Sequence, residues 1–154
     1  MDLGHWENHT GISQINFDDY TGFIYRIVFD DGSYYWGKKK FWNAQYKYSK
    51  WKTGKKRRTR YYTEADWRSY LSSSDQVQEK IREGIGYKAQ MIAVFTTART
   101  LGYAENLAII NSGSYEDIDL GINWRLEKVQ GKLGMKDTDD SQLSHLKTVT
   151  GALR

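Results

Sequence analysis

The sequence predicts a small α+β domain, and four segments of the chain carry that prediction. Residues 22–29 and 33–38 are rich in aromatic and β-branched residues and flank the turn sequence Asp30-Asp31-Gly32, which predicts a hairpin of two strands. Residues 88–95 alternate and then become wholly apolar, as in a third strand. Residues 97–111 carry apolar side chains at helical spacing. A chain of 154 residues is long enough for one compact core of this kind.

Local signals predict three further helices. Thr63, with Asp66 three positions later, resembles a capping box and predicts a helix over residues 64–71. Ser74 predicts a second helix that ends near Glu83, before two glycines. A last helix is expected over residues 118–129.

The chain is expected to divide into three parts. Residues 1–20 are polar and non-periodic and predict an N-terminal arm, residues 21–131 form the domain, and residues 132–154 form a polar C-terminal tail. Within the domain, residues 39–60 are interpreted as a basic insertion of loops and short extended pieces, with residues 59–62 extended.

Composition restricts the classes of function. The chain is 39% hydrophobic and 27% charged, which is typical of a soluble globular domain, and no apolar run is long enough to span a bilayer. The first residues lack the basic and apolar regions of a secretory signal, so we expect a cytoplasmic protein without a membrane partner. With no cysteine and three scattered histidines, any bound metal should be a hard cation held by oxygen ligands.

The basic residues are concentrated in one segment. The net charge is only +4, yet residues 38–60 contain no acid and hold eleven of the 23 basic residues: Lys38, Lys39, Lys40, Lys47, Lys50, Lys52, Lys55, Lys56, Arg57, Arg58 and Arg60. Such a run is most often a solvated surface. The interleaved Phe41, Trp42, Tyr46, Tyr48 and Trp51 favour nucleic-acid binding instead, because aromatic rings stack on bases while cations contact phosphates.

The hairpin brings phenols and ammonium groups to one place. Side chains alternate along a strand, so Phe23, Tyr25 and Ile27 share a face, and pairing about Gly32 places Tyr25 near Tyr35. Lysines 38–40 follow directly. Most aromatic hairpins are structural, but this combination suits contact with a phosphodiester.

These residues resemble a known signature. Phe23-Ile24-Tyr25, followed after nine residues by Tyr35-Trp36-Gly37, resembles the motif of the GIY-YIG nucleases, with Phe for the first Gly and Trp for the second Ile. Further segments are similar to a subgroup of that family found in tailed phages: residues 35–42, 54–60, 64–70, Ser73-Ser74 and Tyr103-Ala104-Glu105. The resemblance covers residues 21–126.

The resemblance implies a three-stranded antiparallel sheet flanked by helices and a phage-encoded, nicking or homing-type endonuclease that acts on double-stranded DNA in the host cytoplasm. It implies that Glu105 is the single protein ligand of Mg²⁺ or Mn²⁺. It also implies that Tyr25 is the base or the water-positioning phenol, and that Tyr35 contacts phosphate or water. Lys38 and Lys39 are candidates to stabilise a phenolate.

The residues themselves leave several roles open. Glu105 falls at the edge of an apolar helix face, where a carboxylate either joins an ordinary ion pair or binds a metal. The family's arginine has no counterpart, because the position ten past Tyr35 is Gln45; the substitutes are Arg57, Arg58, Arg60 and Arg68. The family's late asparagine is either Asn111 or Asn123. The expected catalytic set is therefore Tyr25, Tyr35, Lys39, Arg58 and Arg68, and the expected nucleic-acid contacts are Lys38, Lys40, Lys55, Lys56, Arg57 and Arg60.

Two other functions remain alternatives at this point. The departures at Phe23 and Trp36, together with the missing arginine, suit a scaffold that binds nucleic acid without cleaving it. The exposed aromatics expected in the basic insertion also suit a protein that binds host machinery.

Overall fold

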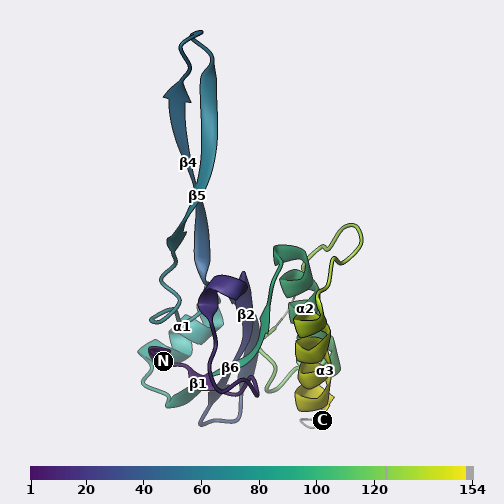
Figure 1. The fold of residues 1–154 in the computed structure, drawn as a ribbon. Helices are drawn as coiled ribbons and strands as arrows, with labels where there is room; N and C mark the ends of the chain where they lie inside the picture. The colour runs from purple at the N-terminus through teal and green to yellow at the C-terminus, as the bar shows by residue number, and fades with distance from the viewer. Residues whose placement is uncertain (124, 152–154) are drawn as a thin grey trace.

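The structure is a computed structural model that describes residues 1–123 and 125–151 of the chain (Figure 1). Its strands and helices, in chain order, are β1 (Glu7–Asn8), the 3₁₀ helix η1 (Phe17–Asp19), β2 (Gly22–Phe29), β3 (Tyr34–Lys40), β4 (Trp42–Lys50), β5 (Lys56–Glu64), α1 (Asp75–Arg82), β6 (Tyr87–Phe95), α2 (Ala98–Asn111) and α3 (Asp137–Gly151). The predicted α+β class is confirmed. Within the described residues, no helix is long and apolar enough to cross a membrane.

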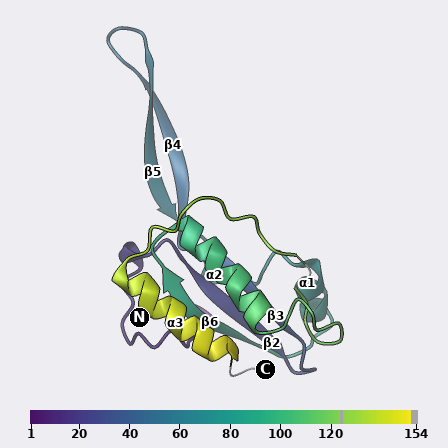
Figure 2. The same cartoon turned by 90° about the vertical axis from the view of Figure 1, so that its right-hand side faces the viewer.

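The main sheet has the strand order β1-β6-β2-β3. The three long strands are antiparallel, and β1 adds a short parallel pairing to β6. Helices α2 and α3 lie side by side over one face of this sheet (Figure 2). Strand β3 is at one edge, and that edge carries the candidate site.

The sheet separates two hydrophobic clusters. On one face, Phe23 and Tyr25 pack against residues of the N-terminal arm and of the segment before α1, including Trp6 and Trp67. On the other face, Ile24 and Trp36 pack against helices α2 and α3. The period of two along β2 produces this division, because successive side chains point to opposite faces.

Strands β4 and β5 form a second, two-stranded sheet that stands away from the rest of the molecule (Figure 1). We call it the ribbon. The basic insertion is thus one continuous hairpin rather than loops and short extended pieces. Its base is fixed by buried Phe41, and Trp42 donates a hydrogen bond from Nε1 to the carbonyl oxygen of Phe17 at 3.2 Å.

Two predicted helices are wrong and one helix was not predicted. Residues 65–71 form turns and irregular chain after β5, and Thr63 and Glu64, where the helix was expected to begin, are still paired with β4. The described part of residues 118–129 is irregular and lies along β3 instead; Trp124 is outside the described residues. The predicted polar tail contains α3, which buries Leu143 and Leu146 against the sheet side that α2 also covers.

The capped helices agree with the sequence signals. The Ser74 hydroxyl accepts a hydrogen bond from the Val77 amide at the start of α1, and the Thr97 hydroxyl accepts one from the Thr100 amide at the start of α2. Such caps satisfy amide groups that have no partner within the helix. The start of α2 fixes where Glu105 lies, two turns further along.

Candidate active site

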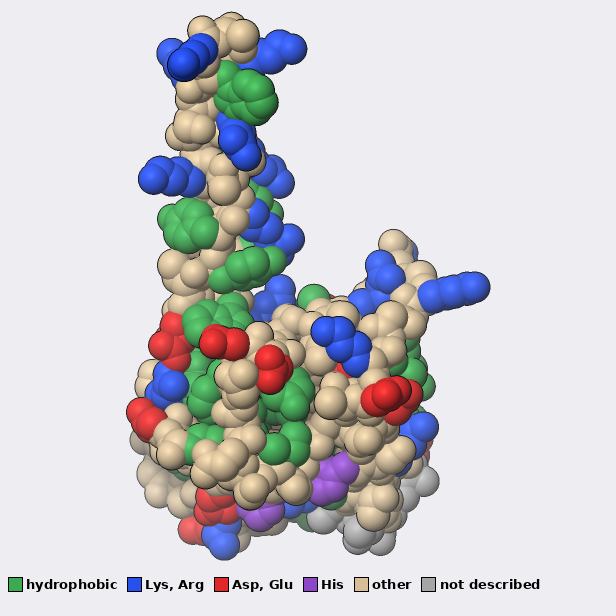
Figure 3. Space-filling model, viewed as in Figure 1, with side chains coloured by type: hydrophobic (Ala, Val, Ile, Leu, Met, Phe, Trp, Pro, Cys, Tyr) green, Lys and Arg blue, Asp and Glu red, His purple; other side chains and the backbone are tan. Residues whose placement is uncertain are grey.

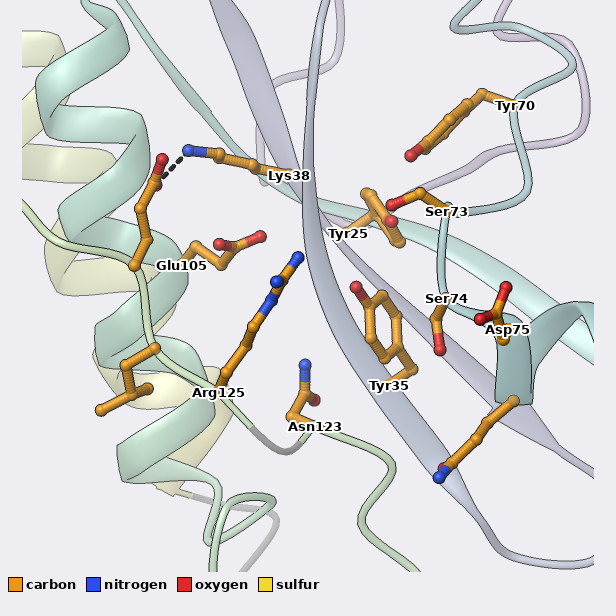
Figure 4. Close-up of a pocket in the computed structure, with 13 residues that line it drawn as sticks. Tyr25, Tyr35, Lys38, Tyr70, Ser73, Ser74, Asp75, Glu105, Asn123 and Arg125 are labelled. Carbon is orange, nitrogen blue, oxygen red and sulfur yellow. Dashed lines mark hydrogen bonds and ion pairs between the residues drawn. The ribbon is translucent and has the colours of Figure 1, made fainter.

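A cavity of about 570 Å³ lies along the outer edge of β3. Its walls come from five places in the chain: β2, β3, the start of α1 with the segment before it, helix α2, and residues 123 and 125–127. Figure 4 shows that the cavity reaches around the strand, with Tyr25, Tyr35 and Tyr70 on one side of β3 and Lys38, Glu105 and Arg125 on the other. The edge of the sheet therefore gathers phenols, cations and a carboxylate.

The two motif tyrosines are neighbours, as the sequence predicted. Their ring centroids are 6.1 Å apart. Tyr25 pairs with Gly37 across the two strands, and a Cβ on Gly37 would lie 2.3 Å from the Tyr25 hydroxyl oxygen. The glycine of the second motif thus makes room for the tyrosine of the first.

Both phenols are held in the neutral form. Burial raises the pKa of Tyr25 well above its ordinary value of 10.0, and burial also raises the pKa of Tyr35. The Ser72 hydroxyl contacts both phenols and opposes these shifts. In the protein alone, Lys38 is paired with Glu127 and Lys39 with Asp66, and their role in stabilising a phenolate stays a prediction.

Ser72 adopts an unusual backbone conformation. Its φ is 85°, and it is the one non-glycine residue of the described chain with a positive φ. Its hydroxyl accepts the Ser74 amide at 3.0 Å, and Gln78 donates to its carbonyl oxygen at 2.8 Å. Such conformations persist only where surrounding contacts impose them, and here they hold a hydroxyl against the two phenols. No pattern in the sequence indicated this residue.

Glu105 extends from α2 to the open edge of β3. Its carboxylate accepts the backbone N–H of Lys38, and burial raises its pKa to about 7. The nearby Glu127 carboxylate raises this pKa further, whereas the charges of Lys38 and Arg125 lower it. Glu105 is thus a half-buried carboxylate that lies close to a second carboxylate.

Residues 125–127 close the cavity on the α2 side. Lys38 forms an ion pair with Glu127, which Figure 4 shows as a dashed line. The Asn106 side chain holds Glu127 by two hydrogen bonds to its backbone, at 2.7 and 2.9 Å. A Cβ on Gly102 would lie 2.7 Å from the Glu127 carboxylate, so this glycine in α2 leaves room for the ion pair.

The arginine of the site is Arg125, which sequence reasoning missed. The predicted Arg58 lies on β5 in the ribbon, and the predicted Arg68 contacts Glu64 and Asp2 outside the cavity. Arg125 comes from a segment wrongly expected to be helical, so no local pattern indicated it. Lys39 is also outside the cavity; its Nζ is 2.6 Å from Asp66 and lies 3.9 Å from the centre of the Tyr70 ring.

Of the two candidate asparagines, Asn123 lines the cavity. Its side chain accepts a hydrogen bond from the Trp36 amide at 2.9 Å and donates one to the Trp36 carbonyl oxygen at 2.7 Å. Asn111 instead hydrogen-bonds to Lys147 and Thr150 of α3. Gln45, the residue at the expected arginine position, is on the ribbon.

The predicted nucleic-acid contacts divide between two places. Lys38 lines the cavity, and Lys40 lines a second hollow at the base of the ribbon. The others are exposed on the ribbon: Lys55 in its turn, and Lys56, Arg57 and Arg60 on β5.

The two departures from the family motif are core residues. Phe23 and Trp36 are both 0% exposed and belong to the two hydrophobic clusters on opposite faces of the sheet. Both pack in the core, and Tyr25, Tyr35 and Glu105 still line the cavity.

The donor set fits a hard divalent cation. Glu105 and Glu127 provide carboxylate oxygens close to each other, which are the ligands that such a cation prefers. The described residues contain no group of three or more His, Cys, Asp or Glu side chains that could hold a metal. An ion here would complete its coordination with water and substrate oxygens.

Comparison with known proteins assigns the family. Residues 6–117 match the family model described as "Putative endonuclease segE, GIY-YIG domain". Comparisons with curated proteins and with solved structures give no significant match. The match spans more than half of the chain and includes both motif tyrosines and Glu105. The chain therefore belongs to the GIY-YIG endonuclease family.

Proposed function

We propose that the protein is a metal-dependent endonuclease that hydrolyses phosphodiester bonds of double-stranded DNA. One observation carries this proposal: the edge of β3 collects Tyr25, Tyr35, Lys38, Glu105 and Arg125 around one cavity. Phosphodiester hydrolysis needs a positioned water, positive charge at the phosphate and a stabilised leaving oxygen. These five side chains are of the right types for those tasks.

The cations of the site would bind the scissile phosphate. Lys38 provides a point charge and Arg125 a planar guanidinium suited to two phosphate oxygens. Lys38 is paired with Glu127 in the protein alone, so substrate phosphate would compete with this carboxylate.

The phenols would orient the water and the phosphate as neutral groups. Because burial raises both pKa values, each hydroxyl can donate one hydrogen bond and accept another. This favours the water-positioning role for Tyr25 over the role of base. Ser72 would keep both hydroxyls in place.

Glu105, with Glu127 beside it, would hold Mg²⁺ or Mn²⁺. When bound, such an ion supplies charge stabilisation at the phosphate and lowers the pKa of a coordinated water. The chain's own contribution is to present an ionised carboxylate, which Lys38 and Arg125 favour through their charges.

The resemblance to the tailed-phage subgroup supports a phage-encoded enzyme that acts in the host cytoplasm. The described residues form one candidate active site, which favours nicking, because one site cuts one strand at a time. The test is incubation of supercoiled plasmid with Mg²⁺ or Mn²⁺ and, in parallel, with a chelator. Nicked circles should form before linear product, and only with metal; intact plasmid with both metals would contradict the proposal.

The Lys38–Glu127 ion pair also supports the alternative, a module that binds DNA without cleaving it. In that case the paired Lys38 would stay unavailable to the phosphate. Salt-sensitive binding without any cleavage would select this alternative.

A further inference from the structure

The ribbon is exposed along its whole length. Every residue of β5 is exposed, as is every residue of β4 except Trp42. Figure 3 shows lysine, arginine and apolar side chains distributed over it up to the tip. A two-stranded hairpin without a core is marginally stable in water, so a surface this rich in Arg and Tyr suits an external partner.

The two faces of the ribbon differ in chemistry. Residues that pair across β4 and β5 share a face, and Tyr46 pairs with Arg60 while Tyr48 pairs with Arg58. Above Trp42, Ala44 and Glu64 at its base, this face carries the residues that we call the basic-aromatic face: Tyr46, Tyr48, Lys50, Lys56, Arg58, Arg60 and Tyr62. The opposite face carries Asn43, Gln45, Lys47, Ser49, Arg57, Thr59, Tyr61 and Thr63. Most of the charge is therefore on one side.

Two arginines of the basic-aromatic face are stacked on tyrosines. The Arg58 guanidinium lies 4.0 Å from the centre of the Tyr46 ring, and that of Arg60 lies 5.0 Å from the Tyr62 ring. Stacking restricts these long side chains before any ligand binds and leaves their N–H edges available to acceptors.

The same face leads to the active site. A hollow of about 610 Å³ at the base of the ribbon is lined by Arg60, Tyr62, Lys40 and Ala98, among others. Strand β3 contributes Lys38 to the active-site cavity and Lys40 to this hollow. Helix α2 likewise contributes Glu105 to the cavity and Ala98 to the hollow. The seven-residue step between them along the helix corresponds to roughly 10 Å. A single ligand can therefore contact both the active-site cavity and the hollow at the base of the ribbon.

The dimensions of the ribbon match one groove of DNA. Strands of 9 residues at about 3.3 Å each extend for roughly 30 Å, close to one turn of duplex. The major groove, about 12 Å wide, admits a two-stranded ribbon, whereas the minor groove, about 6 Å wide, is too narrow.

We propose that the basic-aromatic face of the ribbon lies in the major groove of duplex DNA and reads base edges there. Arg58 and Arg60 are the reading residues, because bidentate contact with guanine O6 and N7 is the commonest specific contact of arginine. The bases that the ribbon contacts lie to one side of the cleaved bond, because the ribbon extends away from the active-site cavity. This inference rests on the proposed function for the choice of DNA as ligand.

The test compares DNA binding by variants on the two faces of the ribbon, at neighbouring positions along its length. Binding is measured with a chelator present, in a Glu105→Gln background, to a 40-bp duplex recovered from a randomised pool by that protein. Arg58→Gln and Arg60→Gln should each weaken binding about tenfold or more. The control is Lys47→Gln, which also removes one positive charge. Lys47 pairs with Thr59, which lies between the two arginines on β5, so it is at the same height on the ribbon but on the opposite face. Its loss should weaken binding less than about threefold.

A second measurement identifies the groove. Methylation of guanine N7, which lies in the major groove, should interfere with binding over a block on one side of the mapped cut. Equal effects of Lys47→Gln and the arginine variants, or no interference at N7, would overturn the inference. If the wild type cleaves plasmid while the faces behave alike, only this inference fails. If the faces differ but plasmid stays intact, the hydrolytic function fails and groove binding stands.

Discussion

The active-site cavity and the ribbon hold their functional groups in opposite ways. In the cavity, Tyr25 is 1% exposed and touches the position where a Gly37 side chain would be, so small displacements matter. On the ribbon, Tyr48 is 65% exposed, and Arg58 and Arg60 stack on exposed tyrosines instead of packing in a core. In the cavity, activity depends on the placement of each group, so single substitutions should reduce it sharply. On the ribbon, the lysines act through their summed charge, so single lysine substitutions should reduce binding only slightly.

The largest effect is expected for Glu105→Gln. The substitution removes the charge and keeps the shape, so cleavage should fall about a thousandfold or more, while DNA binding persists because the cations remain. Plasmid cleavage and duplex binding measure the two effects. Near-normal cleavage would place the metal elsewhere, and an unfolded variant would make Glu105 a structural ion-pair partner.

Gly37→Ala should lower cleavage by about a hundredfold, because the new methyl group would displace the Tyr25 phenol. Overpacking should also reduce the free energy of unfolding by about 2 kcal/mol. Gly134→Ala is the matched control, since a Cβ there meets no atom within 4 Å. Equal behaviour of the two variants in cleavage assays and urea denaturation would contradict the described contact.

Comparing Arg125→Ala with Arg68→Ala tests which arginine serves the site: Arg125, which lines the cavity, or Arg68, which the sequence predicted. The loss of Arg125 should lower kcat/KM by roughly ten- to a hundredfold, because a cation at the cavity is removed. The loss of Arg68 should leave cleavage unchanged and cost under about 1 kcal/mol of stability, from its surface ion pair with Glu64. Steady-state cleavage and thermal unfolding distinguish them, and a larger effect at Arg68 would restore the sequence-based assignment.

The raised pKa of Glu105 predicts a pH-dependent stability. The folded protein holds this proton up to about pH 7, whereas an unfolded glutamate releases it near 4.5. Stability from this group is therefore full below pH 4.5 and is lost as the pH rises through 7, by at most about 3 kcal/mol. Urea denaturation of the wild type and Glu105→Gln at pH 5 and pH 8 measures it. A constant difference between the two proteins would show that the pKa is ordinary.

The smallest effect per residue is expected for Lys55 and Lys56 at the end of the ribbon. Lys55→Gln with Lys56→Gln should lower the slope of log K against log salt by about 0.9 for each lost phosphate contact, with only a few-fold loss of affinity. Cleavage at saturating DNA should be unchanged. A sharp loss of cleavage at saturation would mean that the ribbon also positions the scissile phosphate.

The sequence predicted best where one element's own pattern decides its structure. Strands β2 and β6 and helix α2 were predicted because each buries one or both faces within a single run of residues. The ribbon was interpreted as irregular because neither of its faces is buried, so it lacks apolar alternation. Helix α3 was missed because few of its residues are apolar, and Leu143 and Leu146 alone do not indicate a packed helix.

The same rule holds for the site residues: those on elements with a clear local pattern were predicted, and the others were not. Tyr25, Tyr35, Lys38 and Glu105 are carried by elements with local signals, and the structure brings them together. Arg125 and Asn123 are on a segment whose path is set by pairing of Gly121 with Tyr34 across the chain. Such long-range pairing leaves no trace in local composition, so arginines from the basic insertion were chosen instead.

The covering of β3 has a consequence for how the protein behaves at high concentration. The Asn123 amide occupies the N–H and C=O of Trp36, and the Glu105 carboxylate accepts the N–H of Lys38. The backbone of Tyr34 is paired with Leu120 and Ile122, so without these two side chains the part of β3 from Trp36 to Lys38 would offer unpaired backbone groups on which another molecule could add a strand. The residues that build the site thereby also prevent edge-to-edge association of the sheets of two copies of the chain. The Asn123→Ala variant should therefore aggregate under conditions in which it is still folded.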